Sequence, residues 1–188
     1  ARILEVMNQH SKRLGLLAND LLTLAQLESG KSTLETSEID LLRFFSDLVR
    51  DWNKKFVTKN LKATIDVADD CPSARGDEAR LREVFDNLLD NAVKYSNKDG
   101  EIRLGAQNRG DAIALSVSDD GIGISSEDIS RIFERFYRAD KARSRELGGT
   151  GLGLSIVKHI AQLHGGGVEA ESESGKGTKI SVILPVSA

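Results

Sequence analysis

Four glycines in the stretch GGTGLGLSI, residues 148–156, stand directly before an apolar helical pattern. Glycines allow the backbone to approach a ligand closely, and the start of a helix offers unpaired N–H groups to an anion. The stretch lacks the Lys-Ser/Thr of a Walker phosphate loop, and the third glycine of a dinucleotide fingerprint falls on Leu154. We therefore expect Gly151 and Gly153 to hold phosphate in another way.

Two asparagines, Asn87 and Asn91, lie four residues apart on a predicted helix over 78–95. This spacing places both on the flank of the helix's apolar stripe. Asparagine is a poor helix former, and an unpaired buried amide costs on the order of 1–3 kcal/mol. Amide oxygens are also suitable Mg²⁺ ligands. The residues alone leave two alternatives open, namely a metal or phosphate contact and hydrogen bonds to neighbouring backbone.

Asp119 follows an alternating strand over 112–118, and Gly121 and Gly123 allow a tight turn behind it. A carboxylate at this position can accept a hydrogen bond from the amino group of adenine, whereas the carbonyl of guanine would be repelled. An ordinary Asp-Asp-Gly turn is the alternative.

A basic run precedes the glycine stretch, and one of its cations is expected to contact phosphate, the others forming a solvated surface. Its members are Arg138, Lys141, Arg143 and Arg145. The stretch SGKGTKI at 174–180 indicates a further glycine turn, which on its own predicts a hairpin.

The elements that must position these residues follow from apolar periodicity. Residues 2–29 have apolar or semi-apolar positions at steps that alternate mainly between four and three, typical of a coiled-coil seam. Such a helix needs a partner for its apolar face, so we expect a helical bundle with a second copy. Thereafter we expect a strand in 32–41, a helix over 41–58 capped by Asp40, a strand over 61–68, a helix over 78–95 capped by Asp77, a hairpin of 101–108 and 111–119, a short helix in 126–137, a mobile loop over 138–150, a helix over 151–164, and strands in 165–173 and 177–186.

Composition restricts the class of protein. The chain has 188 residues, 39% hydrophobic content and a net charge of −3, which argue for a globular domain and against a general nucleic-acid binder. No apolar run approaches the length of a membrane span. The single cysteine, Cys71, is interpreted as a structural residue of a reducing compartment. We therefore expect a cytoplasmic location, with membrane attachment only through segments outside this chain.

The order of the motifs is more specific than any one of them. NLLDNAVKYS, DDGIG, IFERFYR, GGTGLGLSI and GKGT follow one another along the chain. This series resembles the N, G1, F, G2 and G3 boxes of the catalytic and ATP-binding domain of sensor histidine kinases. The resemblance implies an α+β Bergerat fold, a mixed, mostly antiparallel sheet covered by helices on one face, over residues 31–188. It also implies that residues 1–30 form the second, coiled-coil-like helix of the dimerisation and phosphotransfer domain.

The resemblance implies a Mg²⁺ and phosphate end of the site. Asn91 would coordinate Mg²⁺, Asn87 would support phosphate or metal, and Lys94 would contact phosphate. Arg138 could reach the γ-phosphate, and Phe133 and Phe136 would anchor the near end of a lid. The residues expected to close over the phosphates are Gly149, Gly151, Leu152 and Gly153.

The adenine end follows in the same way. Tyr95 would lie against adenine, and Asp119 would bind its amino group. Gly121 and Gly123 would let the chain pass under the base, and Thr178 would lie near it. The implied cofactors are ATP and Mg²⁺, and the implied reaction is phosphoryl transfer to a histidine, with relay to an aspartate of a response regulator receiver domain.

The chain departs from the family at the phosphoacceptor. None of the three histidines has the expected acidic follower and Thr/Asn-Pro. His10 is interpreted as a packed bundle residue, and His159 and His164 as surface and helix-end residues. We therefore expect the acceptor helix to precede residue 1, the intact protein to be a homodimer, and this chain alone not to be self-sufficient for autophosphorylation.

Three alternatives remain open on the sequence. One is another ATPase of the gyrase, Hsp90 or mismatch-repair type, which steady hydrolysis would favour. Another is a non-catalytic nucleotide-binding or dimerisation module. The third is a serine kinase of the anti-sigma type, which the long N-terminal seam helix disfavours.

Overall fold

The computed structural model describes residues 2–28, 33–71, 73–139 and 149–186, without the side chains of residues 2–6, 9, 10, 12 and 13. The interpretations of His10, Lys141, Arg143 and Arg145 therefore lie outside the described residues, as does most of the loop predicted at 138–150. The chain begins with the single helix α1, Arg2–Glu28.

A five-stranded sheet forms the centre of the fold. Its strands are β2 (Lys62–Val67), β4 (Glu101–Asn108), β5 (Ala112–Asp119), β6 (Gly167–Glu173) and β7 (Gly177–Pro185). Their order is β2-β4-β5-β7-β6. Only the β2–β4 pair is parallel, and the other three pairs are antiparallel. The predicted mixed, mostly antiparallel sheet is thus confirmed.

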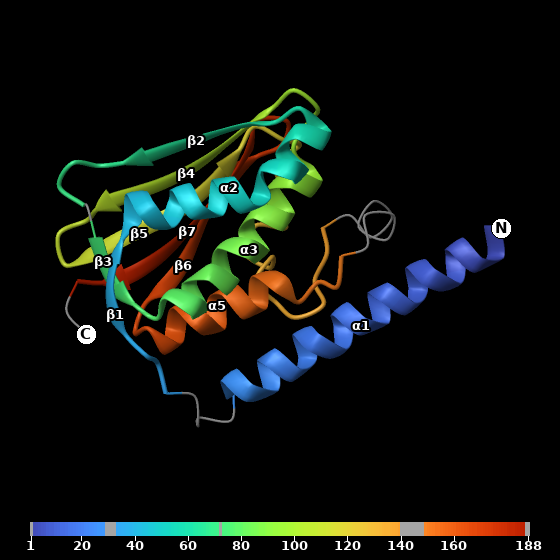
Figure 1. The fold of residues 1–188 in the computed structure, drawn as a ribbon, viewed down its shortest axis with the longest axis horizontal. Coiled ribbons are helices and arrows are strands. Elements are labelled where there is room, and N and C mark those ends of the chain that lie inside the picture. Colours follow the sequence, from blue (N-terminus) through green and yellow to red (C-terminus); the bar gives the residue numbers. More distant parts are fainter. Residues whose placement is uncertain (1, 29–32, 72, 140–148, 187–188) are drawn as a thin grey trace.

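Three helices cover one face of this sheet: α2 (Leu41–Lys59), α3 (Glu78–Tyr95) and α5 (Gly153–Leu163) (Figure 1). Both predicted caps are confirmed, since Asp40 accepts the N–H of Arg43 and Asp77 accepts the N–H of Arg80. Capping satisfies backbone donors that a helix leaves unpaired at its start. A small antiparallel sheet of β1 (Ser37–Asp40) and β3 (Ser73–Gly76) adjoins these helices.

The core lies between the sheet and the helices. Phe45 and Phe85 are fully buried, and their ring centroids lie 5.2 Å apart. Trp52 on α2 is 8% exposed, and its indole N–H donates to Asp86 on α3 at 2.7 Å. These contacts fix α2 against α3. Cys71 is buried, as a structural residue would be.

Helix α1 packs along α5, with its N-terminal part extending beyond the domain (Figure 1). Leu24 and Leu27 are buried against the domain, whereas Met7, Leu14 and Leu22 are at least 60% exposed. The predicted helix is therefore present. Its pairing into a coiled coil stays a prediction.

The prediction of a short helix in 126–137 is wrong. The segment forms consecutive turns, in which Arg131, Glu134 and Tyr137 each donate to the carbonyl three residues earlier. At Phe136 the chain takes a left-handed φ of 61°, and its N–H bonds to the carbonyl of Gly151 at 2.8 Å. This long-range bond draws the backbone away from a helical path. Strand β3 is not predicted by the sequence, because SARG has no apolar alternation.

Candidate functional site

Asp119 is the last residue of β5 and stands opposite Thr178 near the start of β7. Its Oδ1 accepts the N–H of Gly121 at 2.9 Å. The hydroxyl of Thr178 lies 2.9 Å from that of Ser172 on β6. One end of the sheet therefore collects polar side chains that the sequence places at strand ends.

The pKa of Asp119 is raised to about 6, mainly because the carboxyl is buried and also because of the neighbouring charge of Asp120. Backbone hydrogen bonds from Gly121 and Thr178 and the charge of Lys59 act in the opposite direction. The carboxyl therefore ionises just below neutral pH. At neutral pH it is a half-buried anion that can accept a hydrogen bond from an amino group.

Gly121 lies where the turn after Asp119 meets the end of α3. A Cβ at this position would stand 2.4 Å from the carbonyl oxygen of Tyr95. That carbonyl accepts the N–H of Ile122 at 3.3 Å. Only a residue without a side chain allows this approach. Gly123 continues the turn and lies close to Glu173.

Asn87 faces the beginning of α5. Its Nδ2 donates to the carbonyl of Glu83 at 2.9 Å, as the backbone alternative expected. Its Oδ1 lies 2.6 Å from where a Cβ of Gly153 would be. The glycine thus lets the first turn of α5 approach an amide of α3.

Asn91 lies one turn further along α3 and is half-buried. Within the part of the chain that the structure describes, its amide makes no hydrogen bond. Amides buried to this degree normally have a hydrogen-bond partner. Since the Asn91 amide has none among the described residues, its oxygen is available to a ligand. The ammonium of Lys94 pairs with the carboxylate of Asp90 at 2.5 Å. A phosphate contact, as expected from the sequence, would require this ammonium to bind the carboxylate and the phosphate together.

The glycine stretch continues into α5. Leu152 is the N-cap residue and its side chain is fully buried, so only its backbone can reach a ligand. The N–H of Leu152 bonds to the hydroxyl of Thr150 at 3.2 Å. The first N–H groups of α5 have no partner within the helix, which makes this end suitable for an anion.

Arg138 and Gly149 hold the two ends of the intervening segment together, because the guanidinium donates to the glycine carbonyl. Phe133 packs against the core, and its predicted role as an anchor of the lid stays a prediction. Phe136 differs, since its ring is 58% exposed and only its backbone anchors the chain, through Gly151.

Sequence reasoning missed a connection between α1 and this site. Asp20 on α1 accepts a hydrogen bond from the hydroxyl of Thr150 at 2.6 Å. Glu28 pairs with Arg135 and lies 3.4 Å from Nε2 of His159. No local pattern could have shown these contacts, because the partners lie more than a hundred residues apart.

The prediction that His164 lies on the surface is wrong. The residue stands at the end of α5 as predicted, but it is only 6% exposed rather than on the surface. Its Nε2 accepts the N–H of Asp77 at 3.0 Å, and its Nδ1 lies 2.8 Å from the carbonyl of Ile160. The imidazole therefore joins the end of α5 to the start of α3.

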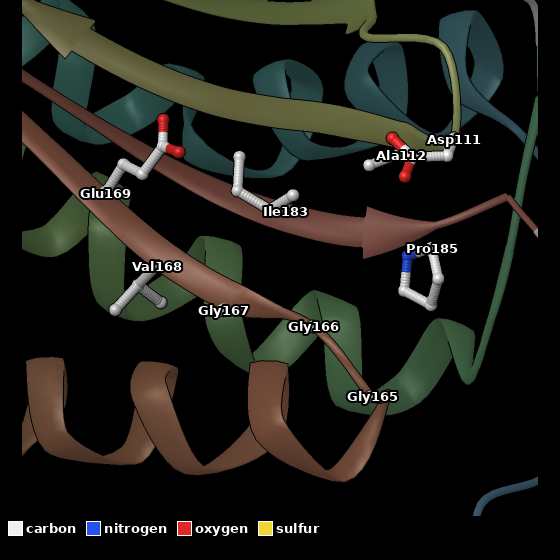
Figure 2. A pocket seen from close by; sticks show the side chains of 9 residues that line it. All are labelled: Asp111, Ala112, Gly165, Gly166, Gly167, Val168, Glu169, Ile183 and Pro185. Atoms are coloured by element: carbon white, nitrogen blue, oxygen red, sulfur yellow. The ribbon is translucent and has the colours of Figure 1, made fainter.

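A hollow of about 370 Å³ opens at the start of β5 and the end of β7, which is the end of these strands away from Asp119 and Thr178. Asp111, Gly165 and Pro185 are among the residues that line it (Figure 2). Glu169 on its rim pairs with Arg109 at 2.6 Å. None of the residues predicted to bind nucleotide lines it. Among the described residues there is also no cluster of three His, Cys, Asp or Glu side chains that could hold a metal ion.

The sequence model of a family described as histidine kinase-, DNA gyrase B- and HSP90-like ATPase matches residues 76–188. The sensor histidine kinase WalK of Bacillus subtilis (strain 168) is 37% identical over 186 residues, which cover 98% of this chain and 30% of WalK. This chain therefore spans less than a third of that relative's length.

Two solved structures have the same fold. Full-length ShkA in complex with AMPPNP has a TM-score of 0.83 at 29% identity, covering 98% of this chain and 37% of ShkA. The histidine kinase ThkA in complex with the response regulator protein TrrA has a TM-score of 0.78 at 21% identity, covering 100% of this chain and 51% of that one. The strand-end Asp119, the Gly121 turn and the glycine start of α5 all lie within the residues that the family model matches. Because that model matches more than half of the chain and WalK is similar along nearly all of it, the chain belongs to the histidine kinase-, DNA gyrase B- and HSP90-like ATPase family, and its catalytic domain is of the sensor histidine kinase kind.

Proposed function

We propose that this chain is the ATP-binding catalytic part of a sensor histidine kinase in a two-component system. It would transfer the γ-phosphoryl group of Mg-ATP to an imidazole nitrogen of a histidine, releasing ADP and a proton. A response regulator aspartate would then receive the phosphoryl group. The observation that carries the proposal is the half-buried Asp119 carboxyl, at the edge where Thr178 and the Gly121 turn meet.

The adenine end is proposed to lie at this edge. An ionised Asp119 would accept a hydrogen bond from the amino group of adenine, while the Gly121 turn, Gly123, Thr178 and Tyr95 surround the base. The complex of full-length ShkA with AMPPNP supports a nucleotide for this kind of domain. Guanine would present a carbonyl to the same carboxylate and would be rejected.

The phosphates are proposed to lie between α3 and the start of α5. The N–H groups at Gly151, Leu152 and Gly153 would face them, with Arg138 and Lys94 supplying positive charge. The oxygen of Asn91, unpaired among the described residues, fits a Mg²⁺ ligand, and Asn87 would support the same end.

Residues 1–30 are proposed to be the second helix of the dimerisation and phosphotransfer domain, and residues 31–188 the catalytic domain. The exposed leucines of α1 support pairing within a bundle in the intact homodimer. A response regulator receiver domain is the proposed partner, and the complex of ThkA with the response regulator protein TrrA supports this choice. No helix among the described residues is long and apolar enough to cross a membrane.

Calorimetry with AMPPNP in the presence and absence of Mg²⁺ tests this proposal. We expect the wild-type chain to bind, the non-hydrolysable GTP analogue GMPPNP not to bind, and both Asp119→Asn and Asn91→Ala to weaken binding. Thermal unfolding of each variant controls for folding. Absence of binding to a folded wild-type chain would overturn the proposal.

A further inference from the structure

Lys59, the last residue of α2, directs its ammonium group at the end of α3. Its Nζ donates to the carbonyl of Val93 at 2.6 Å, of Lys94 at 3.1 Å and of Ser96 at 2.6 Å. The side chain is half-buried. An ammonium has three donors, and here three backbone carbonyls from a single turn accept them.

This arrangement is more than a surface contact. The last carbonyls of a helix have no partner within it and carry a partial negative charge, so a cation at this position is stabilising. The neighbouring chain reinforces the junction, because Asn60 donates to the carboxylate of Asp99 at 2.5 Å and the N–H of Asp99 donates to the carbonyl of Lys59. The end of α2 is thus tied to the segment that follows α3.

The turn held by Lys59 is also the support of the Asp119 turn. Tyr95 stands in the chain between Lys94 and Ser96, whose carbonyls Lys59 binds. The carbonyl of Tyr95 accepts the N–H of Ile122 and lies so close to Gly121 that a Cβ there would not fit. Gly121 in turn donates its N–H to Asp119. A shift of the α3 end would therefore pass through one backbone contact to the carboxyl.

The charges around Asp119 agree with this geometry. Among the described residues, the charge of Asp120, next to it in the chain, raises the pKa of its carboxyl, and the charge of Lys59 from α2 lowers it. The carboxylate of Asp99 accepts a hydrogen bond from Asn60, the residue that follows Lys59. Removal of the Lys59 charge would leave the carboxyl protonated at higher pH.

We propose that Lys59 is a positioning residue for adenine recognition, which holds the last turn of α3 and thereby places the Asp119 carboxylate. Lys59 acts through the backbone and through its charge and touches no nucleotide. This inference rests on the proposed function, because it takes Asp119 as the group that binds adenine.

The test is the dissociation constant of Mg-AMPPNP for wild type, Lys59→Met, Lys59→Gln and the control Lys54→Met, each measured between about pH 6 and pH 8. Lys54→Met removes the same charge from an exposed side chain of α2. Titration of the nucleotide's own phosphates is common to all variants and cancels in the ratio of variant to wild-type dissociation constants.

We expect the Lys59→Met ratio to be raised at about pH 8 and to rise further towards pH 6, by an amount set by how far loss of the Lys59 charge raises the pKa of Asp119, where a rise of one unit would give up to roughly tenfold. Lys59→Gln keeps donors for the carbonyls but not the charge, so it should show the same rise with a smaller effect at about pH 8. Lys54→Met should remain near wild type throughout.

Three results would overturn the inference while leaving the proposed function intact. These are a ratio that does not change with pH, Lys59 variants that match Lys54→Met, and failure of both Lys59 variants to fold, which would show a purely structural role. Failure of the wild-type chain to bind AMPPNP at any pH would instead overturn the proposed function, and the inference with it.

Discussion

The carboxylate of Asp20 on α1 and the hydroxyl of Thr150 in the glycine stretch share a 2.6 Å hydrogen bond across 130 residues of sequence. The same hydroxyl accepts the N–H of Leu152, the N-cap residue of α5. One side chain therefore connects the N-terminal helix to the backbone that we propose contacts phosphate.

Replacing Thr150 by Val should loosen this connection. A hydrogen bond to a charged group contributes about 1.5–3 kcal/mol, so amide hydrogen exchange in α1 and at residues 149–152 should become faster. Asp20→Ala should have the same effect, and the double variant should add little. Exchange that is unchanged in α1 would show that its other contacts, the buried Leu24 and Leu27 and the pairing of Glu28 with Arg135, suffice to hold it on the domain.

Asp119→Asn should stabilise the ligand-free chain in a pH-dependent manner. The pKa of this carboxyl is about 6 in the folded chain, above its ordinary value, so the folded state binds more protons than the unfolded state. The stability that this proton contributes is fully present below about pH 4 and is lost as pH rises through about 6.

The Asp119→Asn variant has no carboxyl to ionise at this position, so it does not lose this stability as pH rises. It should exceed wild type in free energy of unfolding by on the order of 1–2 kcal/mol at about pH 8, a value reduced for the carboxyl's partial exposure. The difference should approach zero near pH 4, and urea unfolding at several pH values measures it. A difference that is the same at every pH would show that burial of the charge is not the cause.

Asn91→Ala should separate binding from stability. The amide has no partner among the described residues, and alanine is the better helix former, so the free energy of unfolding should rise by about 0.5 kcal/mol. The matched control is Asn53→Ala, from an exposed position of α2, which should gain the same amount. Only Asn91→Ala should lose the Mg²⁺-dependent part of AMPPNP affinity, and an equal loss in both variants would contradict the proposed metal contact.

Gly121→Ala should destabilise the chain even without nucleotide. Its methyl group would stand 2.4 Å from the Tyr95 carbonyl, and overpacking of this kind costs about 1–3 kcal/mol. Gly167→Ala is the control, because a Cβ there meets nothing within 4 Å. Urea unfolding should separate the two variants, whereas equal stability would mean that the turn relaxes freely.

Local patterns predicted those parts of the fold that local physics determines. Asp40 and Asp77 precede apolar periodic runs and do cap helices, and the alternation that ends at Asp119 does end a strand. The same patterns located the glycine start of α5 to within two residues, since Gly151 and Gly153 precede an apolar helical run.

The features that were missed depend on tertiary contacts. Lys59 looks like an ordinary helix-end lysine until α3 folds against α2 and presents its carbonyls. His164 has the sequence context of a surface residue, yet the packing of α5 on α3 buries it. The segment 126–137 has a helical pattern, but the bond from Phe136 to Gly151 competes with a regular helix.

The only tryptophan in the sequence is Trp52, and it lies between α2 and α3 with its indole bonded to Asp86 and the Lys55 ammonium 3.6 Å from its ring. Intrinsic tryptophan fluorescence is therefore a spectroscopic signal of one interface, the packing of these two helices. Emission should shift to longer wavelength when the catalytic domain unfolds. Detachment of α1 should leave the emission unchanged, so the two events can be resolved optically without a label.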